Sequence, residues 1–137
     1  KIENDKDDHI EISVPRDMFS KQALENLKKL IAGKETILKH AFRTEQLDVI
    51  EALETISFPW FPLASEPDAV AAYTEFISKL CNLAINAKRV SLTDKEVANE
   101  KYVFRCFILR LGFISDKYKV ARKILLENLT GNSAFRV

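Results

Sequence analysis

Apolar residues recur along this chain at two different spacings, and each spacing predicts a different kind of element. Residues 9–14 alternate between apolar and polar side chains, which is the pattern of a strand buried on one face, and Pro15 ends it. The alternation returns at Ile56, Phe58 and Trp60. Because an isolated strand leaves its backbone groups without partners, we expect these two strands to pair with each other.

The second strand contains a proline and a run of aromatic side chains. Pro59 has no N–H, so we expect this strand to lie at an edge of the sheet or to end near this residue. Two interpretations of Phe58, Trp60 and Phe61 stay open. They form part of the core, or they stand on a proline-stiffened edge strand and offer a docking edge to a partner protein.

Helical spacing dominates the rest of the first half. A first helix is expected to begin after Asp17 or Ser20 and to end at Gly33. A second, short helix carries Ile37, Leu38, Ala41 and Phe42 on its apolar face. A third, capped by Thr44, is expected to carry Leu47, Ile50 and Leu53.

The second half contains a long amphipathic helix and then a helix that is apolar nearly all round. The long helix starts at Pro67, and its apolar face carries Tyr73, Phe76, Ile77, Leu80, Leu83, Ala84 and Ala87. Over residues 102–111 apolar side chains cover almost the whole circumference. We therefore expect this segment to be the central buried helix, with Phe104 and Cys106 in the core and Gly112 at its end.

The final helix carries the densest group of cations. Ser115 is expected to cap it, and the inward positions are Tyr118, Ala121, Ile124 and Leu125. Its outward face places one leucine among three cations. Together with a lysine just before the helix, these residues are the candidate contacts for a partner: Lys117, Lys119, Arg122, Lys123 and Leu126.

These elements predict an α+β fold: a mostly helical single domain of about five or six helices with a minor two-stranded sheet. A length of 137 residues is most simply one domain, which we place at residues 9–137 after a flexible polar leader at residues 1–8. A chain of this size buries about two-thirds of its unfolded surface, so its core needs neither disulfides nor metals. Because the chain begins at Lys1 rather than at methionine, we expect it to be a fragment of a longer protein.

Candidate chemistry is sparse. His9 opens a strand, and His40 lies near a helix end, where a cation suits the helix dipole. The sequence has no Cys-x-x-Cys or His-x-x-x-His motif and only three scattered glycines, so it predicts no catalytic residues, no cofactor and no metal site. Cys81 and Cys106 lie in apolar helical patterns, so we expect two buried, reduced thiols, which indicates the cytoplasm. No segment is apolar enough to predict a membrane partner.

The charge distribution points to binding rather than to catalysis. Residues 1–98 carry 13 Lys and Arg against 17 Asp and Glu, a net charge of −4, whereas residues 99–137 carry 8 against 3, a net charge of +5. This asymmetry indicates an anionic partner or self-complementary packing. We expect a non-enzymatic binding or regulatory module that acts through protein–protein contact or as a homo-oligomer, with Leu126 as an apolar anchor. The alternative is a nucleic-acid-binding domain, in which the turn at residues 111–115 joins two helices and the cations meet phosphates.

The C-terminal third also resembles a known family. The segments concerned are Asn99-Glu100-Lys101-Tyr102, Phe104-Arg105, Leu109-Arg110-Leu111-Gly112, Tyr118-Lys119, Ala121-Arg122-Lys123 and Gly131-Asn132-Ser133-Ala134-Phe135. They are similar to the virulence-related (virulence-associated) proteins of phages and integrative elements of Gram-positive gut bacteria, over residues 73–135. The resemblance implies a mobile-element, prophage-type origin, a cytoplasmic setting and a longer parent protein with a small N-terminal module. It implies no activity and no catalytic residues.

Overall fold

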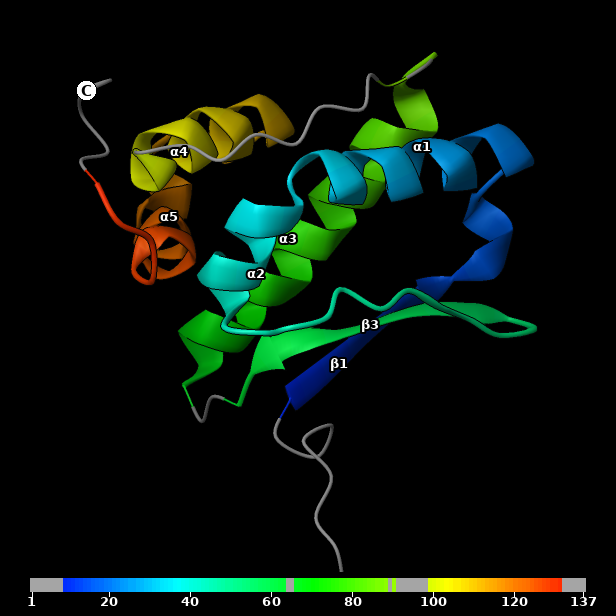
Figure 1. The fold of residues 1–137 in the computed structure, drawn as a ribbon, viewed down its shortest axis with the longest axis horizontal. Helices are drawn as coiled ribbons and strands as arrows, with labels where there is room; N and C mark the ends of the chain where they lie inside the picture. The colour runs from blue at the N-terminus through cyan, green and yellow to red at the C-terminus, as the bar shows by residue number, and fades with distance from the viewer. Residues whose placement is uncertain (1–8, 64–65, 89, 91–98, 132–137) are drawn as a thin grey trace, which may run out of the picture.

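The computed structural model of this chain describes residues 9–63, 66–88, 90 and 99–131. Figure 1 shows a small antiparallel sheet below a layer of helices. The elements are β1 (His9–Pro15), η2 (Arg16–Met18), α1 (Lys21–Gly33), α2 (Glu35–Phe42), β2 (Ile50–Glu51), β3 (Thr55–Pro62), α3 (Pro67–Asn86), α4 (Glu100–Leu111), η3 (Asp116–Tyr118) and α5 (Lys119–Leu126). The predicted α+β, mostly helical fold is confirmed.

The sheet has one strand more than predicted. β1 and β3 pair in antiparallel fashion with Ile12 opposite Phe58, as expected. The short strand β2 pairs with the other side of β3, so the strand order is β1-β3-β2. The third helix predicted after Thr44 is therefore wrong, and Leu53 is 91% exposed in the turn between β2 and β3. Pairing with β3 gives the backbone groups of β2 hydrogen-bond partners. A helix with only three apolar residues would bury little apolar surface against the core.

A β-bulge explains the proline in β3. The pairing register shifts between Ile10 and Ile12 of β1, so Pro59 and Trp60 lie opposite a single residue. Pro59 thus occupies the central strand at an irregularity in the ladder, not a sheet edge or a strand end as predicted. A bulge leaves one residue out of the ladder, so a missing N–H is tolerated there.

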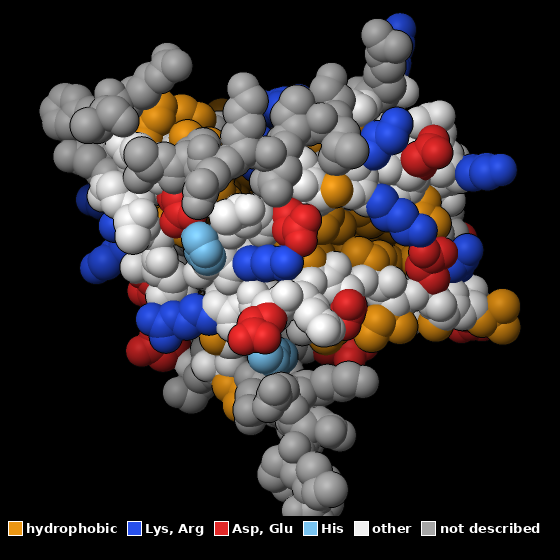
Figure 2. All heavy atoms as spheres, in the orientation of Figure 1, with side chains coloured by type: hydrophobic (Ala, Val, Ile, Leu, Met, Phe, Trp, Pro, Cys, Tyr) orange, Lys and Arg blue, Asp and Glu red, His pale blue; other side chains and the backbone are white. Residues whose placement is uncertain are grey.

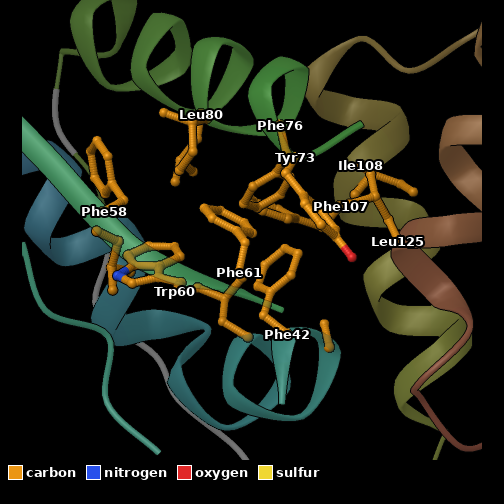
Figure 3. Close-up of a cluster of buried hydrophobic side chains, with 14 of the residues drawn as sticks. Phe42, Phe58, Trp60, Phe61, Tyr73, Phe76, Leu80, Phe107, Ile108 and Leu125 are labelled. Atoms are coloured by element: carbon orange, nitrogen blue, oxygen red, sulfur yellow. The ribbon is translucent and has the colours of Figure 1, made fainter. Parts of the chain in front are cut away.

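The bulge also decides between the two interpretations of the aromatic run. Phe58, Trp60 and Phe61 all turn toward the helices and are 0% exposed. Figure 3 shows them packed with aromatic side chains of α2 and α3, including Phe42 and Tyr73. The ring of Phe42 lies edge-on to that of Phe61 with their centroids 4.6 Å apart, and the ring of Phe61 stacks on that of Tyr73 with a centroid distance of 5.0 Å. These residues are core, and the predicted aromatic docking edge is wrong.

The central helix is α3 rather than α4. Eight residues of α3 are buried: Ala69, Ala72, Tyr73, Phe76, Ile77, Leu80, Cys81 and Ala84. On α4 the hydrophobic core takes Phe104, Phe107 and Ile108, as predicted for Phe104, but Cys106 is exposed and its assignment to the core is wrong. Among the described elements α4 contacts α3 and α5, and it lies at the outside of the helix layer (Figure 1).

Local signals place the helix ends. The Ser20 side chain accepts a hydrogen bond from the Ala23 N–H and caps α1, as one of the two predictions had it. Asn26 of α1 is fully buried, and its Nδ2 donates to the carbonyls of Ala84 and Ala87 at 3.1 and 3.0 Å. A side chain of α1 therefore satisfies the C-terminal carbonyls of α3. Within the described residues, no helix combines the length and the apolar character needed to cross a bilayer.

Candidate docking surface at the basic corner

The turn between α4 and η3 reverses the chain in a short corner. Gly112 ends α4 with φ of 117°, a conformation that favours glycine. Phe113 then turns inward and is 0% exposed, whereas Ile114 turns outward and is 60% exposed. Ser115 follows with φ of 79°, so the expected serine cap is absent and a 3-10 turn precedes α5.

Arg122 holds this corner together. Its Nη1 donates to the carbonyl oxygens of Phe113 at 3.0 Å and Ser115 at 2.9 Å. Arg122 is one of the predicted partner contacts, but the structure commits one of its guanidinium nitrogens to the turn. Charge-assisted bonds of this kind are among the stronger hydrogen bonds in proteins. Arg122 is therefore a structural residue of the corner.

Leu126 was predicted to lie on the outward face of the last helix, but it is buried. The structure buries it, together with Leu125 and Leu129, in the hydrophobic core. The reason is that α5 packs against three helices, α2, α3 and α4, so a wider arc of it is covered than a single packing face predicts. The prediction of Leu126 as an exposed anchor for a partner is wrong.

Three lysines and two aliphatic residues are among the exposed side chains here, and we call these five the basic corner: Ile114, Lys117, Lys119, Val120 and Lys123. Val120 is 52% exposed. At 100° per residue, it lies about 100° around the α5 axis from Lys119 and about 60° from Lys123. None of the three lysines forms a salt bridge with a residue that the structure describes. The structure thus keeps three of the predicted contact residues and adds two aliphatic ones.

The corner rests on α3 through a partly buried cation. The ammonium of Lys79 lies 5.5 Å from the Phe113 ring and 4.7 Å from the Tyr118 ring. It also pairs with Glu75 at 3.4 Å, and Glu75 accepts a hydrogen bond from the Tyr118 hydroxyl at 3.4 Å. These contacts fix η3 against α3, so the exposed residues stand on a supported turn.

The face seen in Figure 2 differs from the basic corner. Over α1 and α2, lysines and arginines are interspersed with acidic side chains, and no large patch of one sign appears. His40 of α2 lies on the molecular surface and its Nδ1 is 2.5 Å from Oε2 of the nearly buried Glu100 at the start of α4. This pair joins the two helices. Across the described ranges no three His, Cys, Asp or Glu side chains are grouped as metal ligands would be.

Comparisons of the chain with protein-family models, with curated proteins and with solved structures found no match. The resemblance to the virulence-related family therefore stays a prediction, and the function has to be inferred from the geometry. Ile114 and Val120 are exposed but were not predicted to contact a partner. A signal for Val120 was present, since it lies next to Lys119 and one helical turn from Lys123 on a wheel.

Proposed function

We propose that this chain is a non-catalytic protein-binding module and that its basic corner docks an acidic, partly apolar segment of a partner protein. One observation carries the proposal: two largely exposed aliphatic side chains, Ile114 and Val120, stand among three lysines that form no salt bridge with a described residue. An apolar anchor with a charged rim is the usual anatomy of a binding hot spot.

The two kinds of residue have different roles in this proposal. Covering a side chain such as Ile114 or Val120 removes apolar surface from water, which is worth about 1.5–3 kcal/mol for complete burial. The lysines sit at the rim, where they speed the approach of an acidic partner and reject a basic one more than they add affinity. A partner segment with aliphatic residues flanked by Asp or Glu satisfies both requirements.

Nucleic-acid binding has less support at this corner. Arg122, the guanidinium best suited to phosphate, is bonded to the turn. Exposed aliphatic residues are of no use to a phosphate contact.

The test is a selection of short peptides from a random displayed library on the immobilised protein, followed by binding measurements with the selected peptides. We expect the peptides to be enriched in Asp, Glu and aliphatic residues. The double change Ile114→Ser and Val120→Ser should weaken them about tenfold or more, because it removes the anchor. Leu53→Ser is the matched control, since it removes an exposed leucine at the far end of β3.

Two results contradict the proposal. One is peptide binding that the double variant retains in full. The other is tight binding of duplex DNA that falls steeply with salt, disappears when Lys117, Lys119 and Lys123 are changed to Gln, and is unaffected by Ile114→Ser and Val120→Ser. That second result would assign the corner to nucleic acid.

A further inference from the structure

A groove of about 540 Å³ opens at the opposite end of α5 from the basic corner. It lies where the ends of α2, β3 and α5 meet the start of α3 (Figure 1). Its lining residues are Arg43, Pro62, Leu63, Glu66, Ala69, Tyr73, Glu127 and Asn128. The volume falls in the range of ligand-binding clefts, and none of the residues of the basic corner takes part.

Tyr73, a mostly buried residue, contributes its hydroxyl group to this groove. The residue is only 5% exposed, and in Figure 3 its oxygen points out of the aromatic cluster on the side of Leu125. Its hydroxyl has no hydrogen-bond partner among the described residues, although every fully buried side-chain nitrogen or oxygen there has one. The hydroxyl oxygen therefore opens into the groove. Burial, and then the negative charge of Glu127, raise the pKa of Tyr73, so it stays a neutral hydroxyl.

The electrostatics of the groove favour a cation. Glu66 and Glu127 lie on its walls, and neither pairs with a described cation. The C-terminal ends of α2 and α5 add two partial negative charges, against one partial positive charge from the start of α3. Among the described lining residues, Arg43 carries the one opposing full charge. The Nδ2 of Asn128 is used by the Ala41 carbonyl, which leaves the side-chain oxygen of Asn128 as a further acceptor.

The remaining wall is apolar. Pro62, Leu63 and Ala69 line one side of the groove, and Leu63 is 62% exposed. A flexible aliphatic stem can cover such a surface while its charged end reaches polar groups. The groove therefore combines a surface for a stem with hydrogen-bond acceptors for a head group.

We propose that this groove binds a basic side chain of a peptide, with the aliphatic stem on Pro62, Leu63 and Ala69. The guanidinium or ammonium head lies between Glu66 and Glu127, and the Tyr73 hydroxyl oxygen accepts one of its hydrogen bonds. Arg43 weakens this binding, because its charge opposes that of the ligand. The site is separate from the basic corner, and its failure would leave the proposed function untouched.

The experiment titrates the isotope-labelled protein with Nα-acetyl-arginine amide and follows the backbone amide signals by NMR. We expect millimolar binding that shifts the signals of Leu63, Ala69 and Asn128. Nα-acetyl-citrulline amide has nearly the same shape without the charge and should bind about tenfold more weakly or not at all.

Variants test the proposal most strictly, because it predicts that some of them weaken arginine binding and that another tightens it. Glu127→Gln and Tyr73→Phe should each weaken arginine binding about three- to tenfold, whereas Arg43→Gln should tighten it. Glu45→Gln, an exposed carboxylate in another hollow, should have no effect. Tyr73→Phe keeps the buried ring, so the fold is expected to survive.

Three outcomes overturn the proposal. The first is the absence of any localised shift at the groove with tens of millimolar probe. The second is equal binding of the arginine and citrulline probes. The third is preferential binding of Nα-acetyl-glutamate amide that Arg43→Gln abolishes, which would make the groove a site for anions.

Discussion

At the scale of single residues, the two cysteines show how one sequence pattern leads to opposite surroundings. Cys81 faces the core from α3 and is 0% exposed, and burial raises the pKa of its thiol to about 12. Cys106 lies on the outer side of α4 and is exposed. Because the thiolate is the nucleophile in alkylation, the two thiols should differ greatly in reactivity.

We therefore expect iodoacetamide at pH 8 to label Cys106 in the folded protein and to leave Cys81 unmodified. Mass spectrometry of the intact protein should show one added group, and two after denaturation. Cys106→Ser should take up none while folded. Rapid labelling of Cys81 in the native state would show that α3 is not the central helix.

Asn26 is a second residue whose role depends on its distant neighbours. Its amide donates to two carbonyls at the end of α3, and it accepts a hydrogen bond from Gln22. We expect Asn26→Ala to lower the free energy of unfolding by about 1–3 kcal/mol, because buried carbonyls lose their donor. Urea denaturation measures this. Glu25→Ala, at an exposed position of the same helix, serves as the control and should change stability little.

At the scale of elements, α5 is the helix whose orientation matters most for the proposed function. It turns Leu126 into the core and Val120 toward solvent, the reverse of an amphipathic helix with Leu126 on its outer face. Leu126→Ala should cost about 2–5 kcal/mol of stability, because it leaves a cavity. Val120→Ala should stay within about 0.5 kcal/mol of the parent. Thermal or urea unfolding of the two variants checks this, and equal effects would mean that α5 is rotated from the orientation described.

The elements also show what a sequence can reveal and what it cannot. Pairing of β1 with β3 was predictable, because each strand carries its alternating pattern in its own residues. The bulge at Pro59 was not, because register depends on the partner strand. Leu126 was misjudged for the same reason: a helical wheel describes one helix, while burial depends on the three helices packed around α5.

At the scale of the whole molecule, Glu51 ties three elements together at the end of the sheet. Its carboxylate lies 2.7 Å from the Lys28 ammonium of α1 and 3.5 Å from the Arg16 guanidinium of η2. The hydrogen bond from Lys28, helped by the charges of Lys28 and Arg16, holds the pKa of Glu51 below its ordinary value of 4.5. A lowered pKa in the folded state stabilises the protein above that ordinary value, and the stabilisation is lost as the pH falls through the folded-state value.

Glu51→Gln should therefore lower the melting temperature slightly at pH 7 and low salt. The difference from the parent should shrink as the pH falls below 4.5 and vanish once the carboxyl group of Glu51 is protonated in the folded protein. Added salt should reduce the difference, because these side chains are exposed. Glu54→Gln, on the same hairpin, should melt like the parent at both pH values. A difference that persists in acid would show that Glu51 acts through packing rather than charge.

The basic corner and the groove differ in how far the sequence predicts them. The lysines of the basic corner lie within seven residues of each other, so their grouping is visible in the sequence itself. The groove cannot be seen in the sequence, because Arg43 follows α2, Tyr73 lies in α3 and Glu127 follows α5, and these residues meet only after folding. Local patterns predict elements and charge runs, whereas concave sites depend on how distant elements converge.

The pairing of β1 with β3 has a consequence for synthesis of the chain. Ile12 pairs with Phe58, which is synthesised 46 residues later, so the sheet cannot form until that part of the chain has been made. At translation rates of about 5–20 residues per second, β1 spends roughly 2–9 s without its partner strand. During that interval its apolar face is open to pairing with other nascent chains, and the polar side chains of Glu11 and Ser13, alternating with Ile10, Ile12 and Val14, reduce that hazard.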